Sequence, residues 1–284
     1  MSGMAPTARI GAVHLTVRDL EGSQRFYERV LGMRAVQRED GSVSLGAVDG
    51  SELLVLHGGP GAAPRDPHRA GLFHFAVLVP SRVALGTALM RLVGSGWPLD
   101  GASDHLVSEA LYLTDPEGNG IEIYRDRPRE EWPRASDGTL EMATLPLDLN
   151  AIAAEADRAS VGAGLPAGTT IGHIHLQVSE LQEIEKFYAE ALGFDVVVRG
   201  YPGALFVSAG GYHHHVGLNT WHSRGGAAAE LGAAGLGWYE ICVGSEDGLA
   251  DCLARVQAAG VVTESVEDGV LVRDPSGNGV LLRA

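Results

Sequence analysis

Two halves of this chain repeat one another, and this internal duplication restricts the fold more than any other feature. IGAVHLTVRDLEGSQRFYERVLGM begins at Ile10, and IGHIHLQVSELQEIEKFYAEALGF begins at Ile171, so the two segments lie 161 positions apart. A second match follows in the same order, because DPEGNG at Asp115 recurs as DPSGNG at Asp274. Two matches in one order indicate that both halves are built from the same elements.

Each half divides again into two similar modules. IGAVHLTV alternates apolar with other residues and predicts a half-buried strand, and the next segment has helical spacing that ends at Gly32. The same order recurs from Leu72, so the chain predicts an α+β fold of four βαβββ modules paired into two glyoxalase-like domains. The further predicted strands lie at 33–37, 42–48, 52–57, near 105–107, 111–114 and 120–124, and the second predicted helix at 82–93.

The repeat also predicts where the domains begin and end. We expect an N-terminal domain over residues 8–126 and a C-terminal domain over residues 169–284. Residues 127–168 form the predicted connector, which contains a short helix within LPLDLNAIAAEADRAS and a flexible joint at VGAGLPAG. Of the two domains, we expect the N-terminal one to carry the active site.

Charge and composition exclude several classes of protein. The 284 residues carry a formal net charge of −15, so we expect no nucleic-acid partner and no basic membrane-binding surface. No apolar run approaches the roughly 20 residues that span a bilayer, and MSGMAPTARI does not resemble a secretory signal. The two cysteines, Cys242 and Cys252, suggest no disulfide framework, and we therefore expect a cytoplasmic location.

Three residues of the first half have the chemistry of a metal site. His14 and His74 lie on the first strands of modules one and two, and Glu122 lies on the last strand of module two. A carboxylate between Ile121 and Ile123 is costly to bury unless it binds something. Two imidazoles and one carboxylate form the facial triad used by non-heme Fe(II) enzymes that react with O₂. The alternative is that both histidines belong to the core.

At this point the chain resembles the vicinal oxygen chelate superfamily of glyoxalases, bleomycin-resistance proteins and extradiol dioxygenases. The segment DHLVSEALYLTDPEGNGIE is similar to the extradiol dioxygenase signature, from which only Ser103 departs. GLFHFAVLVPSR, DRPREEW and GYHHHVGLNTW extend the resemblance to the catechol-2,3-dioxygenase-like branch over nearly the whole chain. The resemblance implies ring cleavage of a small aromatic diol by O₂, as in the catabolism of aromatic compounds.

The resemblance also implies roles for individual residues. His14, His74 and Glu122 would bind Fe(II), and Mn(II) accepts the same ligands. His105 would be an acid/base group in ring cleavage, and Tyr112 would donate a hydrogen bond to a catecholate oxygen. His57 would take up a substrate proton, although no motif fixes it. The structural alternatives are a solvated loop for His105, strand packing for Tyr112 and an exposed or structural side chain for His57.

The second half lacks part of this set. Aligning the halves places His175 where His14 stands, Glu240 where His74 stands, and Leu281 where Glu122 stands. GYHHHVGLNTW is interpreted as the last strand of module three, with His213 and His215 on one face and His214 on the other. His175, His215 and Glu240 would then form a second metal site, and the alternative is a polar network at the domain interface. His173 has no assigned role.

Two other functions remain open at this stage. One is another metal-dependent glyoxalase-like enzyme, an isomerase or a thiol transferase, which the absence of an inward carboxylate at Leu53–Leu56 disfavours. The other is a protein that binds an aromatic ligand without turnover. Metal content and O₂ uptake separate these hypotheses. A homo-oligomer is compatible with the sequence, which leaves the oligomeric state open.

Overall fold

The chain consists of two compact units in the computed structural model, which describes residues 3–228 and 230–284. Unit 1 comprises Met1–Leu15, Ala63–Phe73 and Gly172–Ala284, and unit 2 comprises Thr16–Ala62 and His74–Ile171. Strands β1 and β5 each have residues in both units, so the units do not follow the two sequence repeats. The domain division at 8–126 and 169–284 therefore stays a prediction about the repeat.

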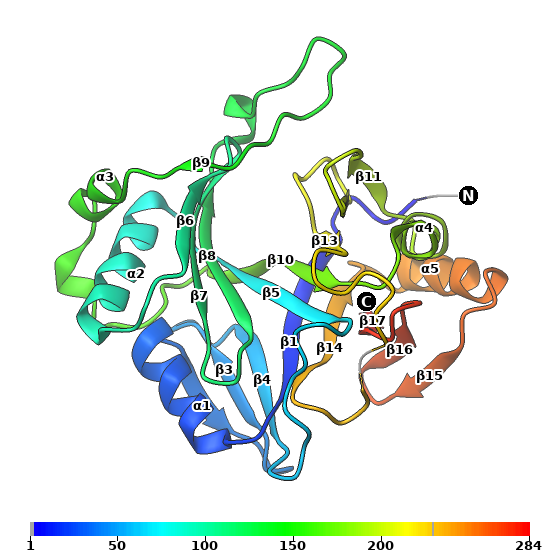
Figure 1. The fold of residues 1–284 in the computed structure, drawn as a ribbon, viewed down its shortest axis with the longest axis horizontal. Coiled ribbons are helices and arrows are strands. Elements are labelled where there is room, and N and C mark those ends of the chain that lie inside the picture. The colour runs from blue at the N-terminus through cyan, green and yellow to red at the C-terminus, as the bar shows by residue number, and fades with distance from the viewer. Residues whose placement is uncertain (1–2, 229) are drawn as a thin grey trace. The chain divides into compact units, whose positions relative to one another are not determined.

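The predicted order of elements is confirmed in all four modules (Figure 1). Module one has β1 (Arg9–Val17), α1 (Leu20–Phe26), the π-helical turn η1 (Tyr27–Leu31), β2 (Arg34–Gln37), β3 (Val43–Gly46) and β4 (Glu52–Gly58). Module two has β5 (Gly71–Leu78), α2 (Arg82–Ser95), β6 (Gly101–Asp104), β7 (Ser108–Thr114) and β8 (Gly120–Asp126). The connector has η2 (Arg129–Glu131), β9 (Leu145–Pro146), α3 (Leu149–Ala154) and η3 (Arg158–Ser160).

The second half follows the same plan. Module three has β10 (Thr170–Gln177), α4 (Leu181–Glu185), the π-helical turn η4 (Lys186–Ala191), β11 (Asp195–Val198), β12 (Ala204–Ser208) and β13 (Val216–Asn219). Module four has β14 (Gly235–Cys242), α5 (Glu246–Ala258), β15 (Thr263–Val266), β16 (Gly269–Arg273) and β17 (Gly279–Arg283). The fold is therefore α+β, with four βαβββ modules as predicted. No helix among the described residues is long and apolar enough to cross a membrane.

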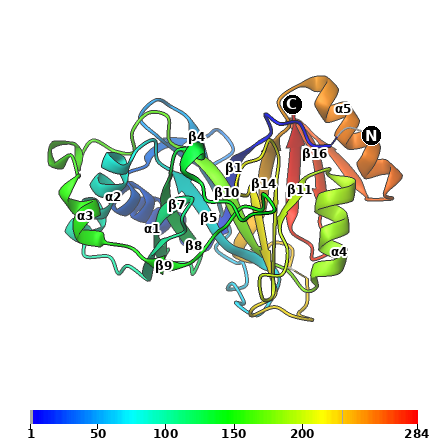
Figure 2. The same ribbon diagram turned by 90° about the horizontal axis from the view of Figure 1, so that it is seen from above.

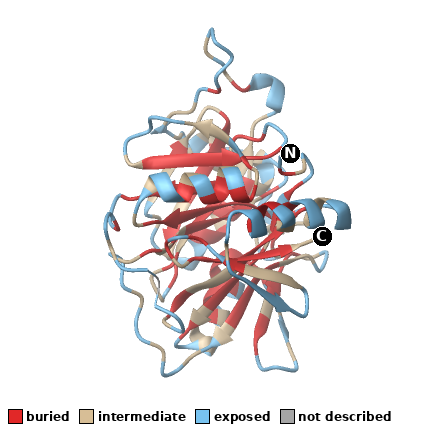
Figure 3. Ribbon diagram, turned by 90° about the vertical axis from the view of Figure 1, so that its right-hand side faces the viewer, coloured by how far each residue is buried: buried red, intermediate tan, exposed pale blue. Residues whose placement is uncertain are grey.

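Each unit contains mixed sheets, in which parallel and antiparallel strand pairs occur together. Within unit 2, the order β5-β8-β7-β6-β9 places β5 parallel to β8, and β8 antiparallel to β7. Within unit 1, β10 lies parallel to β13, and β14 lies parallel to β17. Figure 2 shows α4 and α5 at the right-hand side of the view, and Figure 3 shows strands that are largely buried while the helices expose one side.

A buried arginine closes the first helix of each half. The Arg91 guanidinium of α2 donates to the Leu31 carbonyl at 2.9 Å, and that of Arg255 in α5 donates to the Leu192 carbonyl at 2.7 Å. Each guanidinium also lies against a left-handed glycine, Gly32 in unit 2 and its counterpart in unit 1. A Cβ on Gly32 would lie 2.6 Å from the Arg91 Cζ, so the close approach requires glycine there.

The repeated DPxGN segment forms a tight turn around a buried carboxylate. Asp115 Oδ1 accepts the backbone N–H groups of Glu117 and Asn119, and its Oδ2 accepts the Tyr27 hydroxyl at 2.7 Å. Asp274 makes the matching bonds in unit 1. This turn joins β7 to β8, and in unit 1 it joins β16 to β17. It therefore sets where each last strand begins.

Two local predictions are wrong. The segment near residues 105–107 is a turn rather than a strand, and Leu106 has φ +70° within it. The three histidines at 213–215 precede β13 instead of belonging to it. Gly210 and Gly211 both have positive φ, so the chain turns there before it can enter the strand.

Asp274→Asn is expected to change how stability depends on pH. Burial raises the pKa of Asp274 to about 6 from an ordinary value of 3.8. The carboxyl binds its proton more tightly in the folded chain than in the unfolded one, so its contribution to stability is full below pH 4 and is lost as the pH rises through 6. A shift of this size corresponds to about 3 kcal/mol.

Urea unfolding of both proteins between pH 3 and pH 7 measures this effect. The stability advantage of the wild-type protein over the variant should fall by about 3 kcal/mol across the series. A difference that stays constant with pH would contradict the assignment of the raised pKa to Asp274.

Candidate functional site

His74 and Glu122 meet on neighbouring parallel strands of unit 2. The register pairs His74 with Gly120 and Ala76 with Glu122. The His74 Nε2 and the Glu122 Oε2 lie 3.1 Å apart, and both side chains are buried. A buried carboxylate against an imidazole is the donor chemistry that a divalent transition metal accepts. The predicted association of His74 with Glu122 is therefore present in the structure.

Tyr112 and His105 extend this group along the sheet. Tyr112 lies opposite Glu122 in the register of β7 and β8, and its hydroxyl is 2.7 Å from the His105 Nε2. Burial, together with the charge of Glu122 and a hydrogen bond to it, raises the pKa of Tyr112 well above its ordinary value of 10. Tyr112 therefore stays neutral and joins the carboxylate to the histidine.

The connector fixes the ring of His105. The His105 Nδ1 lies 2.7 Å from the Ala143 carbonyl oxygen, and the Ala143 N–H donates to the His105 carbonyl. Because a carbonyl only accepts, Nδ1 carries a proton and Nε2 of the neutral ring is left to accept from Tyr112. His105 is half-buried at the β6–β7 turn rather than free in solvent.

His57 lies half-buried on β4. Hydrogen bonds from Ser42 lower the pKa of Asp40, and the charge of His57 lowers it further, so His57 is near that surface carboxylate. The proposed proton-accepting role of His57 stays a prediction.

The register of the first strands shows which histidines are equivalent. Val79, Val178 and Val243 each donate a backbone hydrogen bond of 2.8 Å to the last strand of their own module. His74 stands five residues before Val79, and His173 stands five residues before Val178. Trp238 has this position in module four, and Ala12 has it before Val17 in module one. Only modules two and three therefore present a histidine at the position of His74.

His14 has a different position from His74. It stands three residues before Val17, as Ala76, His175 and Glu240 do before their own valines. The registers confirm this equivalence, because Ala76 pairs with Glu122, His175 with Gly217 and Glu240 with Leu281. The alignment of Glu240 with His74 was thus wrong by two residues, which is one full repeat of a strand.

The structure gives His14 partners within unit 1. Its Nε2 is 3.4 Å from the Glu240 Oε1, and its ring stacks on Trp238 with centroids 4.3 Å apart. Glu240 also accepts from the Ala12 N–H and from Arg283. Although burial opposes ionisation, the His14 hydrogen bond and the Arg283 charge leave the pKa of Glu240 lowered. This buried cluster has the composition of a structural ion pair.

The residues proposed for a second metal site have separate partners. The His175 ring packs over Gly217, and a Cβ there would lie 2.9 Å from the His175 Cγ. His175 also contacts the rings of Phe206 and Trp221. The His215 Nδ1 interacts with Ser208 and the Ala209 N–H, and Glu240 pairs with His14. Among the described residues, these three side chains do not form a group able to hold a metal.

His173 is the residue that sequence reasoning left without a role. It is 2% exposed on β10, and the His214 ring lies against it with centroids 4.1 Å apart. The His214 Nδ1 in turn lies 2.8 Å from that of His213. The signal was the spacing itself, since HFAVLV and HIHLQV place a histidine five residues before a valine in both modules.

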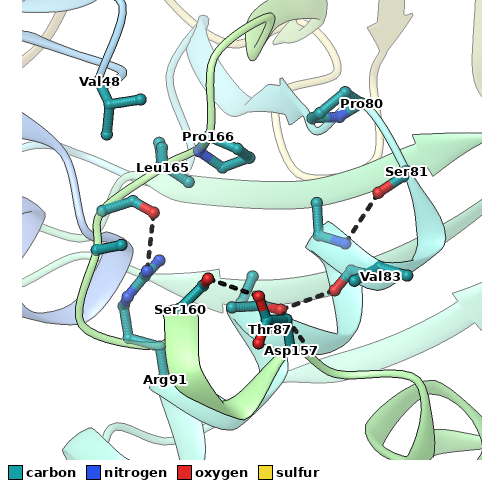
Figure 4. Close-up of a pocket in the computed structure, with 14 residues that line it drawn as sticks. Val48, Pro80, Ser81, Val83, Thr87, Arg91, Asp157, Ser160, Leu165 and Pro166 are labelled. Carbon is teal, nitrogen blue, oxygen red and sulfur yellow. Dashed lines mark hydrogen bonds between the residues drawn. The ribbon is translucent and has the colours of Figure 1, made fainter.

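The polar side chains that line another hollow of unit 2 are engaged in structural hydrogen bonds. It measures about 260 Å³ and lies between α2 and residues 157–166 (Figure 4). Arg91 lines it, but its guanidinium donates to the carbonyls of Leu31, Val161 and Gly164. Thr87 bonds the Asp157 N–H and the Val83 carbonyl. These polar groups hold the connector on α2, so the hollow does not offer a second reactive centre.

Comparison with known proteins agrees with this picture. Residues 9–123 and 170–282 match the family model described as Glyoxalase/Bleomycin resistance protein/Dioxygenase superfamily. The chain is similar to Catechol-2,3-dioxygenase of Bacillus subtilis (strain 168), with 44% identity over 97% of this chain and 96% of that protein. It is also similar to Biphenyl-2,3-diol 1,2-dioxygenase 3 of Rhodococcus globerulus, with 28% identity over 43% of this chain and 66% of that protein.

Solved structures share the fold at low sequence identity. Glyoxalase I from Zea mays aligns with a TM-score of 0.59 and 13% identity, covering 97% of this chain and 92% of its own. A candidate dioxygenase from Bacillus subtilis subsp. subtilis str. 168 aligns with a TM-score of 0.65 and 13% identity, covering 99% of this chain and 85% of its own. At these identities the likeness concerns the fold alone.

Gly11→Ala is expected to destabilise the His14–Glu240 cluster. A Cβ at Gly11 would lie 2.8 Å from the Glu240 Cβ, so the Glu240 side chain that pairs with His14 must shift. Overpacking of this kind costs about 1–3 kcal/mol. Gly94→Ala in α2 is the control, because a Cβ there meets nothing within 4 Å. Chemical denaturation of the two variants should show a loss for Gly11→Ala only, and equal stabilities would refute the tight packing at Gly11.

Proposed function

Because the chain belongs to the glyoxalase/bleomycin resistance/dioxygenase superfamily, we propose that it is an extradiol dioxygenase that opens a catechol-type ring with O₂. The observation that carries the proposal is the buried His74–Glu122 pair with the Tyr112–His105 pair beside it. The chain is an enzyme, an oxidoreductase of the dioxygenase kind, given its 44% identity to a catechol-2,3-dioxygenase over nearly its full length. The ring substituents of the substrate stay open.

We propose His74, Glu122 and His173 as the metal ligands, in place of the set with His14. His173 has the register position of His74, whereas His14 has that of Ala76 and is paired with Glu240. His74 and Glu122 form a buried pair within unit 2, and His173 is proposed as the third ligand because of its register position. Two neutral imidazoles and one carboxylate suit Fe(II), and Mn(II) is the alternative.

The reaction balances without a further reductant. The carbon–carbon bond next to the diol breaks, and both atoms of O₂ enter the ring-opened product. A bound Fe(II) supplies the Lewis acidity and the one-electron chemistry that the reaction with O₂ requires. The contribution of this chain is to bind the diol, orient it and accept or return its protons.

Tyr112 and His105 are placed to move a proton. The Tyr112 hydroxyl has one proton, and it either donates to the His105 Nε2 or bonds Glu122. Tyr112 passes its own proton to the His105 Nε2 and takes a proton from the substrate side in its place, so that Nε2 becomes a donor and the Tyr112 hydroxyl stays protonated. The Ala143 carbonyl holds the ring of His105 in place through this change. His105 is therefore the proposed acid/base group and Tyr112 its partner.

His214 is a further candidate at the same site. Its half-buried ring packs against the proposed ligand His173, and its Nδ1 faces His213. A histidine in this place can orient the ligand ring or exchange a proton beside it. The role that the family resemblance suggested for His57 is better supported at His214, because His214 contacts a proposed ligand.

The proposal is tested by reconstituting the full chain with Fe(II) in the absence of air. About one iron per chain, O₂ uptake with catechol and a yellow ring-cleavage product are expected. Iron without O₂ uptake across several catechols would favour another metal-dependent glyoxalase-like reaction. Tight binding of a catechol with neither iron nor O₂ uptake would favour the aromatic-binding protein.

The proposed ligand set predicts a sharp contrast between two buried histidines. His173→Ala, His74→Ala and Glu122→Gln should each lose most of the bound iron because each removes a ligand. His14→Ala is the matched control, since it removes a buried histidine from another first strand and should keep its iron. Metal analysis of the purified variants gives the result without an activity assay. Loss of iron in His14→Ala, with retention in His173→Ala, would restore the set with His14.

Removal of the proton-transfer pair should leave the metal in place. His105→Ala is expected to keep iron and to slow turnover by about 10²–10⁴-fold, which is the usual scale for loss of an acid/base group. Tyr112→Phe should show a smaller loss, because His105 remains. Steady-state O₂ uptake with catechol measures both variants. Unchanged turnover in His105→Ala would remove this residue from the mechanism.

A further inference from the structure

A hollow of about 330 Å³ lies on unit 1, and none of the residues proposed for catalysis lines it. It is formed where η4 and the end of α5 meet the strands β15 and β16. Its lining consists of Phe187, Val261, Val262, Glu264, Leu271, Val272, Arg273 and Pro275. Most of these side chains are apolar, and Val262 is 86% exposed. Its size is at the lower end of the range for small-molecule pockets.

The other half of the chain fills the corresponding place with its own indole ring. Trp97 follows Gly96, as Val261 follows Gly260, directly after the helix of its module. The Trp97 ring packs on Phe26 with centroids 4.7 Å apart and an angle of 61° between the planes. Its Nε1 donates to the Thr114 carbonyl oxygen at 2.9 Å.

The surroundings of the two places correspond closely. Phe26 and Tyr27 meet edge to face at 5.1 Å and 79°, and Phe187 and Tyr188 do so at 5.0 Å and 79°. Each tyrosine donates to the aspartate of its DPxGN turn. Gly96 and Gly260 have φ of +70° and +71°.

The hydrogen-bond acceptor also has a counterpart. Thr114 precedes Asp115 directly, and Arg273 precedes Asp274 directly. The register pairs Thr114 with Gly120 and Arg273 with Gly279, so the two carbonyls hold equivalent places in their hairpins. Arg273 lines the hollow. The hollow thus keeps the aromatic floor and the backbone of the Trp97 site, while valine replaces the indole.

We propose that this hollow binds a planar aromatic molecule with one ring N–H or O–H donor, of which indole is the simplest example. The ring packs on Phe187 as Trp97 packs on Phe26, and the donor bonds the Arg273 carbonyl. Burial of an apolar ring on this surface is favourable because it removes both the ring and the exposed valines from water. The site shares no lining residue with the proposed catechol site, and it does not rest on the proposed reaction.

Titration of the full-length protein with indole, followed by isothermal calorimetry, tests the proposal. The wild-type protein should bind indole with one saturable site that excess catechol does not displace. Val261→Trp should lose this site, because its own indole then fills the hollow, and should keep the basal catechol activity. Val261→Phe serves the same purpose if the larger residue impairs folding.

A second variant makes the test reciprocal. Trp97→Val should open an equivalent hollow in the other half and add a second saturable site, provided that circular dichroism shows a folded chain. Absence of saturable binding to the wild-type protein would overturn the proposal. Binding that persists in both Val261 variants, or that catechol displaces, would also overturn it, because the indole would then occupy another place.

Discussion

The carboxylate of Asp115 is the constraint on which the candidate site depends. It takes the backbone N–H groups of the DPEGN turn, the Asn119 side chain and the Tyr27 hydroxyl. These bonds fix where β8 begins, and the parallel register with β5 then brings Glu122 beside His74. Burial raises the pKa of Asp115, and the hydrogen-bond donors of the turn offset this effect only in part. The chemistry at Glu122 follows from a turn seven residues earlier.

Much of this arrangement could be predicted from the sequence. The repeat gave the four modules, the buried glutamate in GIEIY gave Glu122, and the motif before it gave His105 and Tyr112. The third histidine could not be chosen in the same way, because His14 and His173 both lie on apolar first strands. The choice depends on whether the histidine stands five or three residues before the valine at the end of its first strand. Aligning His14 with His175 in sequence does not show which of the two strand positions corresponds to His74, whereas the strand registers show that His173 does.

Partners, rather than burial alone, distinguish the structural carboxylates from the candidate catalytic one. Glu109 is buried on β7 and contacts the guanidinium groups of Arg82, Arg125 and Arg127. Glu240 is held by Arg283 and by His14. Glu122 instead meets an imidazole and a phenol. A guanidinium is a permanent cation that competes with a metal for a carboxylate, whereas a neutral imidazole is itself a ligand. All three glutamates lie in apolar strands of the sequence, so the sequence alone does not show whether a guanidinium or an imidazole faces each carboxylate.

The position shared by His14, Ala76, His175 and Glu240 has a consequence for how such a duplicated chain diverges. Each first strand has two positions on the same face, five and three residues before its valine. The proposed histidine ligands stand at the position five residues before it. A module without a histidine ligand can therefore still form an ion pair with another module through the position three residues before the valine, as His14 and Glu240 do. The βαβββ fold of a module can therefore be kept while its metal ligand is replaced. A module that holds no metal ligand can then evolve to bind a different molecule.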